Sequence, residues 1–230
     1  MTSPYRKLLS AIGLGVAASN AIAAPAFQPY ANEGIDSIYN LLFCDDIKAF
    51  APKRGQAPTP WQQVLFSEPA DTEALQRLAG DSAQEGRVRF LACSRLRKLG
   101  SPVQPKIILA VIIEAPLAGG LDTLAAFSEG GVRYINQTGK LAVVESLPTI
   151  RPMVQRLFEA AKPVVARIGA WDKPRLAPPA AGCIRLSFLV SDGLYFGQGP
   201  MSVMQGEPLA APVIREATKL LQAVVAASAR

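Results

Sequence analysis

The sequence predicts an α+β protein in which helices cover an antiparallel sheet of about five strands, with a helical region ahead of the sheet. Three observations support this prediction. Residues 107–113 form an unbroken apolar run rich in Ile and Val, which is typical of a buried central strand. Residues 184–190 alternate between apolar and polar side chains and lead into the turn pair Asp192-Gly193, which indicates a β-hairpin. Residues 35–47 and 150–165 repeat apolar residues every three or four positions, as amphipathic helices do.

The start of the chain has the pattern of a signal peptide. Arg6 and Lys7 precede a run of 11 apolar or small residues from Leu8 to Ala18, and Ala21-Ile22-Ala23 supplies small residues for cleavage. A membrane anchor would need about 20 apolar residues, so the run is too short to span a bilayer. We therefore expect residues 1–23 to be removed after Ala23 and the protein to be periplasmic or secreted, as in bacterial export.

The mature chain begins with an extended leader at 24–33, followed by a helical part at 34–100. Helices are expected at 35–47, 61–66, 71–78 and 85–99, and the Pro-rich stretch 51–60 is expected to be a loop. Asp71 is a suitable N-cap for the third helix, and Gly100 ends the fourth.

The sheet is expected within residues 105–230. After the central strand come a short helix at 121–127, a hairpin with strands at 132–136 and 140–145, a helix capped by Thr149 that Pro163 kinks or breaks, and a second Pro-rich loop at 169–182. A second hairpin then ends at Gly197–Pro200, and a final helix begins near Pro208. No long linker separates the two parts, which favours a single domain over 34–230.

The element order over residues 121–226 is helix, two strands, helix, strands, helix. This order resembles that of the roadblock and profilin-like architectures. The resemblance concerns element order alone, so it implies no function and no site residue.

Composition excludes several classes of chemistry. The chain has no histidine, which rules out Ser-His-Asp and Cys-His hydrolases and His-ligated metal or haem sites. It has no CxxC, P-loop or complete GxGxxG pattern, so neither a metal nor a cofactor is expected. Loss of Arg6 and Lys7 lowers the formal charge from +6 to +4, a mild basicity that argues against a nucleic-acid partner.

Two groups of residues are candidates for a site. The first is a polar hairpin tip that could hold an anionic or sugar-like ligand, formed by Arg133, Tyr134, Asn136, Gln137, Thr138 and Lys140. The second is a set of carboxylates: Glu114, at the end of the central strand, and the adjacent pair Asp45 and Asp46. Both groups also have a structural interpretation, as a solvated turn and as ordinary charged positions.

Cysteines and arginines leave further alternatives open. Cys44 and Cys93 can form a disulfide in an oxidising compartment, or pack as small buried hydrophobes. Residues 87–98 contain five cations, which could bind lipid headgroups or cell-wall polymers if they are exposed: Arg87, Arg89, Arg95, Arg97 and Lys98.

The favoured hypothesis is an exported, non-catalytic binding or accessory protein for a small ligand or envelope component, with self-assembly through a sheet edge or helix left open. No membrane span is expected after cleavage. The alternative is a histidine-independent enzyme that uses carboxylates on a cell-wall or sugar-like substrate. A pocket that holds Glu114 near a second carboxylate would favour the enzyme, whereas an arginine partner for Glu114 would favour the binding protein.

Overall fold

The computed structural model describes residues 27–145 and 147–228. The signal peptide expected at 1–23 lies outside the described residues, as does the start of the leader. From Phe27 to Asn32 the leader has no regular secondary structure, as expected.

A six-stranded antiparallel sheet forms the centre of the molecule, with strand order β4-β3-β2-β1-β5-β6. The strands are β1 (Ile108–Leu117), β2 (Gly120–Phe127), β3 (Val132–Ile135), β4 (Leu141–Val144), β5 (Cys183–Val190) and β6 (Gly193–Pro200). The expected central strand is confirmed, because β1 pairs with β2 on one side and with β5 on the other.

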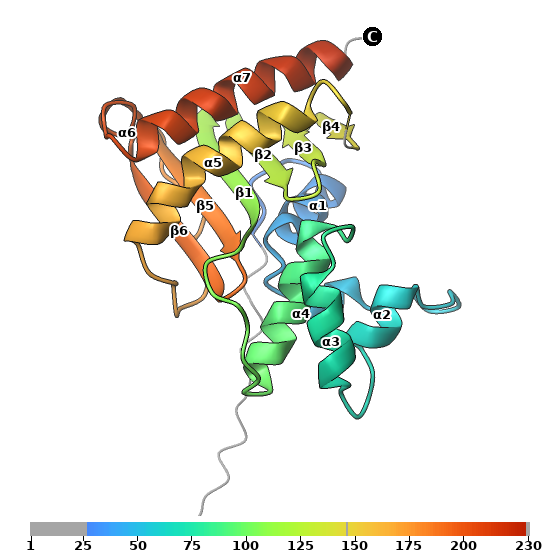
Figure 1. Ribbon diagram of the computed structural model, residues 1–230. Helices are drawn as coiled ribbons and strands as arrows, with labels where there is room; N and C mark the ends of the chain where they lie inside the picture. Colours follow the sequence, from blue (N-terminus) through green and yellow to red (C-terminus); the bar gives the residue numbers. More distant parts are fainter. Residues whose placement is uncertain (1–26, 146, 229–230) are drawn as a thin grey trace, which may run out of the picture.

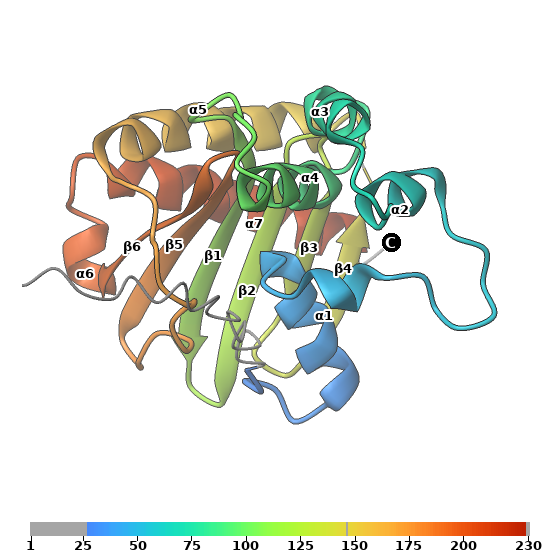
Figure 2. The ribbon, with the colours of Figure 1, turned by 90° about the horizontal axis from the view of Figure 1, so that it is seen from below.

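Helices cover both faces of this sheet (Figures 1 and 2). One face packs against α5 (Arg151–Arg167) and α7 (Ala210–Ser228), and the core there includes Val111 and Leu186. The other face packs against the N-terminal helices, and its core includes Leu109 and Ile112. Those helices are α1 (Glu33–Phe43), η1 (Ile47–Phe50), α2 (Pro60–Leu65), α3 (Thr72–Gly80) and α4 (Gly86–Lys98). The helical N-terminal part therefore shares a core with the sheet.

The α+β fold class is confirmed, and most expected elements lie where the sequence placed them. The Asp71 carboxylate caps α3 by accepting a hydrogen bond from the amide of Ala74, as predicted. Both Pro-rich stretches are loops, apart from Pro60, which begins α2, and an isolated bridge between Trp171 and Leu194. The helix expected to reach position 47 ends at Phe43 instead, because Cys44 adopts a left-handed conformation.

The prediction of a short helix at 121–127 was wrong, because this segment is strand β2. Leu121, Ala125 and Phe127 face the N-terminal helices, while Leu124 and Ala126 face α5 and α7. Since both faces are covered, β2 has no polar alternation, and its Ala and Leu residues resemble a helix in sequence. Pairing with β1 and β3 outweighs this weak helix propensity. The element order behind the resemblance to roadblock and profilin-like architectures therefore does not hold at its first element.

Several predicted boundaries also need correction. Thr149 does not cap α5, because the amides of Ile150 and Arg151 donate to the carbonyl of Leu147 and the backbone itself begins the turn. Pro163 does not end α5, which continues to Arg167 with buried residues on both sides of the proline. Strand β6 extends through Gly197–Pro200, and the short helix α6 (Met201–Met204) follows it.

The turn of the second hairpin lies one residue earlier than expected. Val190 pairs with Gly193, so Ser191 and Asp192 form the turn. Helix α7 begins at Ala210, where the Glu207 carboxylate accepts hydrogen bonds from the amides of Leu209 and Ala210.

Candidate functional site

A row of polar residues crosses the sheet on the face that α1 covers. Thr123 of β2 is the register partner of Glu114 in β1, and Glu114 is also the partner of Arg185 in β5. Gln198 of β6 continues the row beside Arg185. Because opposed residues of antiparallel strands point to the same face, the four side chains lie next to one another. Strand register thus brings together residues that are far apart in the sequence.

Glu114 lies at the centre of this row and is fully buried. The hydroxyl of Tyr39 on α1 donates to Glu114 Oε1 at 2.6 Å, and Arg185 Nη1 lies 3.5 Å from Oε2. Burial raises the pKa of the Glu114 carboxyl, while the Tyr39 hydrogen bond and the Arg185 charge lower it. Glu114 is therefore held in a buried ion pair and is not exposed in a pocket.

Arg185 holds the second Pro-rich loop against the sheet. Its guanidinium donates to the carbonyls of Leu176 and Ala177 at 3.1 and 2.6 Å. It also donates to Oε1 of Gln198 at 2.6 and 2.9 Å, and its guanidinium carbon lies 5.6 Å from the centre of the Phe196 ring. Such a set of partners offsets the cost of removing an arginine from water.

A second buried arginine, Arg175, connects the same loop to α1. Its Nε lies 2.5 Å from Asp45 Oδ2, its Nη1 donates to the Tyr39 hydroxyl at 3.1 Å, and its Nη2 donates to Asn40 Oδ1 at 3.0 Å. The guanidinium carbon lies 3.9 Å from the centre of the Phe43 ring, which is a cation–π contact. Burial raises the pKa of Asp45, and Arg175 opposes that shift.

Side chains of α1 also hold the leader in place. The Asn40 amide donates to the carbonyl of Phe27 and accepts from its N–H, at 2.7 and 3.0 Å. The Asp36 carboxylate accepts from the amide of Tyr30 at 2.9 Å, and the Tyr30 hydroxyl lies 2.8 Å from Oγ1 of Thr123. The leader is therefore bound to both α1 and the polar row.

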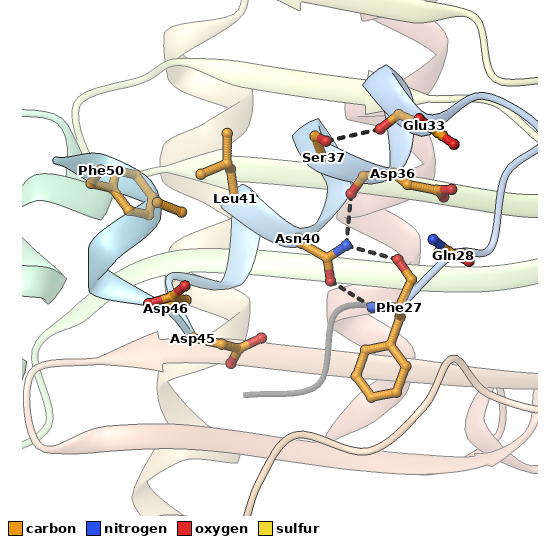
Figure 3. A pocket seen from close by; sticks show the side chains of 11 residues that line it. Phe27, Gln28, Glu33, Asp36, Ser37, Asn40, Leu41, Asp45, Asp46 and Phe50 are labelled. Atoms are coloured by element: carbon orange, nitrogen blue, oxygen red, sulfur yellow. Dashed lines mark hydrogen bonds between the residues drawn. The ribbon is translucent and has the colours of Figure 1, made fainter. Parts of the chain in front are cut away.

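A pocket of about 600 Å³ opens between the leader, α1 and η1 (Figure 3). Its walls combine apolar residues with four carboxylates, and no Lys or Arg is among the described residues that line it: Phe27, Gln28, Glu33, Asp36, Ser37, Asn40, Leu41, Asp45, Asp46, Ala49 and Phe50. We call this the carboxylate pocket. It contains the predicted candidates Asp45 and Asp46 but not Glu114.

The four carboxylates of the pocket differ in how far their oxygens are engaged. Asp45 is paired with Arg175, and Asp36 is buried and bound to the leader. Asp46 is the N-cap of η1, and its Oδ1 accepts a hydrogen bond from the amide of Lys48. The residue is exposed. Glu33 is exposed in the first turn of α1. Glu33 and Asp46 therefore have the most oxygen capacity left for a ligand.

The predicted hairpin tip is formed, and most of its polar groups bind each other or a neighbouring strand. Asn136 Oδ1 accepts from the Thr138 amide, the Thr138 hydroxyl and the Lys140 amide, which closes the turn. Tyr134 and the amide of Gln137 both donate to the Asp122 carboxylate, at 3.0 and 2.7 Å.

Arg133 of the same hairpin pairs with Glu145 at 2.7 Å. Within the described residues the ammonium group of Lys140 forms no ion pair, and this residue is exposed. A ligand-binding role for the tip stays a prediction.

The three cysteines are free thiols, so of the two alternatives for Cys44 and Cys93 the structure has buried thiols and not a disulfide. Cys44 caps α1, with its sulfur near the carbonyls of Leu41 and Arg87, and burial strongly raises its pKa. Burial also raises the pKa of Cys93. Buried thiols with raised pKa values are poor nucleophiles.

Sequence reasoning missed most of the pocket because it used only the apolar face of α1. Glu33, Asp36, Ser37 and Asn40 repeat every three or four residues, so a polar stripe was visible on the other side of that helix. Arg175 gave no such signal, since its partners lie about 130 residues away in the chain.

Comparisons with protein-family models, with curated proteins and with solved structures found no match. Within the described residues, no helix has the length and apolar character needed to cross a bilayer. No group of three or more acidic or cysteine side chains in that part of the chain could hold a metal ion.

Proposed function

We propose that this is an exported, non-catalytic binding protein whose carboxylate pocket holds a small cationic ligand. The observation that carries the proposal is the composition of the pocket wall: four carboxylates, three large apolar side chains and no basic residue among the described lining residues. The volume of about 600 Å³ is in the range of pockets that hold small organic molecules.

The lining favours an amine attached to an apolar group. Phe27, Leu41 and Phe50 offer apolar contact area, while Glu33 and Asp46 retain carboxylate oxygens for an ammonium or guanidinium. Charge-assisted hydrogen bonds to a carboxylate are roughly twice as strong as neutral ones, so they would orient such a ligand.

The surroundings of Glu114 favour binding over catalysis. A general acid needs access to its substrate, and a retaining or inverting pair of carboxylates has to flank the bond that breaks. Glu114 is fully buried between Tyr39 and Arg185 and does not line the carboxylate pocket. An arginine partner was the outcome expected for a binding protein.

Export is supported by the order of charged, apolar and small residues in the first 23 positions. Mass spectrometry of the protein recovered from the producing cell should find Ala24 as the N-terminal residue. Recovery of the intact chain from the cytoplasm would contradict export while leaving the pocket hypothesis standing.

The pocket is tested by thermal unfolding of residues 24–230 with a matched set of probes. Phenethylamine, phenylethanol and phenylacetate share a ring and differ in charge, so only the amine and related amines should raise the unfolding temperature. The variant Glu33→Gln with Asp46→Asn should lose this stabilisation.

A suitable control is Glu73→Gln, because Glu73 is an exposed acid in the first turn of α3, as Glu33 is in α1. The control should keep the stabilisation by amines. Stabilisation by the carboxylate probe, or by no amine in a broad panel, would refute the proposal.

A further inference from the structure

Helices α5 and α7 carry the whole net positive charge of the mature chain. The two helices contain six basic residues, Arg151, Arg156, Lys162, Arg167, Arg215 and Lys219, against Glu159 and Glu216, which gives +4. The mature chain after removal of Arg6 and Lys7 is also +4, so the remainder is balanced. We call the solvent side of α5 and α7 the basic face.

All six basic residues of this face are exposed. The opposite sides of the helices bury Val154, Leu157, Leu220 and Val224 against the sheet, so the charged residues turn outward. Figure 1 shows α5 and α7 side by side as the outer layer of the molecule. The result is a broad positive surface rather than a groove.

The arginines of α4 have structural roles, because each of them binds groups of the protein itself. Arg89 donates to the carbonyl of Ala79, Arg95 to those of Leu65 and Ser67, and Arg97 to that of Ser191. Arg87 pairs with Glu85 and lies over the Phe127 ring. Of the five cations in residues 87–98 that the sequence offered for an anionic partner, the four arginines therefore already bind groups within the protein.

The basic face is different because its charges are only partly compensated. Glu159 pairs with Lys162, and Glu216 pairs with both Arg156 and Lys219. The Lys219 hydrogen bond lowers the pKa of the Glu216 carboxyl, as expected in positive surroundings. Within the described residues, Arg151, Arg167 and Arg215 form no ion pair. Their positive charges are therefore not neutralised by acidic side chains of the protein.

We propose that the basic face binds the surface of an anionic phospholipid bilayer. Basic residues near such a surface each contribute roughly 1 kcal/mol, which is about fivefold in affinity. A bilayer fits the breadth of the face better than a small anion does, since none of the three described pockets is lined by these six residues.

Other features of the two helices define the mode of binding. The apolar sides of both helices are packed in the core. The protein would therefore bind to the bilayer surface through its charges, without inserting apolar side chains into the membrane. Their one aromatic residue, Phe158, packs against the core, so the face lacks the stacking platform of single-strand nucleic-acid binders. Helix α1 lies on the other side of the sheet from α5 and α7 (Figure 2). The carboxylate pocket, which α1 lines, would therefore face away from the bilayer in this orientation.

Co-sedimentation of residues 24–230 with lipid vesicles tests this proposal. Vesicles of phosphatidylglycerol and phosphatidylcholine in equal parts should bind the protein at low salt, and vesicles of phosphatidylcholine alone should not. Binding should be lost in about 0.5 M salt, because the Debye length then falls well below 10 Å.

Two triple variants with the same net charge separate the basic face from charge in general. Arg151→Gln, Arg167→Gln and Arg215→Gln together should weaken binding by on the order of a hundredfold. The control variant carries Lys53→Gln, Arg54→Gln and Lys98→Gln, which are exposed cations on the other side of the sheet that form no ion pair among the described residues. It should retain most of its affinity.

Denaturant midpoints of both variants should match the wild type, since exposed charges contribute little to folding. Equal losses in the two variants, salt-insensitive binding, or equal binding to neutral vesicles would overturn the proposal. Binding to soluble polyphosphate without binding to the anionic vesicles would overturn it as well.

Discussion

Truncation of Glu114 to alanine is expected to destabilise the fold severely. Glu114 is fully buried, and its partner Arg185 is 3% exposed, so the variant leaves a buried guanidinium without its counter-charge. Removing one partner of a buried ion pair typically costs about 3–5 kcal/mol. The Tyr39 hydroxyl also loses its carboxylate acceptor, although Arg175 still contacts that hydroxyl. The loss is a large share of the roughly 5–15 kcal/mol that holds a domain together.

Urea unfolding at neutral pH, followed by far-UV circular dichroism, measures this effect directly. The control is Glu114→Gln, which keeps a side-chain oxygen for the Tyr39 hydroxyl and changes the volume little. It should cost clearly less than Glu114→Ala, because the Tyr39 hydrogen bond remains and no cavity forms, although Arg185 loses its counter-charge in both variants. A loss below about 1 kcal/mol for Glu114→Ala would show that the pair with Arg185 does not stabilise the fold.

Three further predictions follow from the fold. Ile112→Ala in β1 should lower the free energy of unfolding by about 2–5 kcal/mol, while substitution of Gln137 in the hairpin turn should lower it by well under 1 kcal/mol. Denaturant midpoints compare the two variants, and similar midpoints would contradict the central position of β1. Gly120→Ala should cost about 1–3 kcal/mol because an added Cβ would lie 2.1 Å from the backbone oxygen of Gln137, whereas Gly80→Ala, with open space around it, should be nearly neutral in the same assay. Because burial raises the folded-state pKa of Glu114, its contribution to stability is present below the unfolded pKa and is lost as pH rises through the folded value. The free energy of unfolding should therefore increase as the pH falls from neutral toward the ordinary glutamate value of 4.5, with a smaller increase in Glu114→Gln. An unchanged slope in that variant would refute the assignment.

The sequence was informative where burial is one-sided or where a local signal marks a boundary. The apolar stripe of α1 and the Asp71 cap of α3 each follow from local chemistry. The alternation in β5 also indicated a strand, although both faces of β5 are buried and its polar residues Arg185 and Ser187 lie inside the protein. Strand β2 was misassigned because helices cover both of its faces, which removes the polar alternation of a strand. Pro163 was expected to kink or break α5, yet the helix continues past it to Arg167, with buried residues on both sides of the proline.

The candidate site shows a similar division. Asp45 and Asp46 stood out as adjacent carboxylates, and both line the pocket. Glu114 stood out as a charge in an apolar strand, but its partner Arg185 is about 70 residues away and is set beside it only by strand register. Local patterns identify reactive residue types, whereas their partners depend on sheet topology.

Chemical-shift mapping of isotopically labelled residues 24–230 tests the proposed binding site most directly. An amine that raises the unfolding temperature is titrated into the protein, and the amide shifts of the backbone are followed by NMR. The largest shifts should fall within residues 27–50, which line the carboxylate pocket, and include the side-chain amide of Asn40. Shifts confined to the hairpin at 133–140 would contradict the carboxylate pocket and return the site to the polar tip.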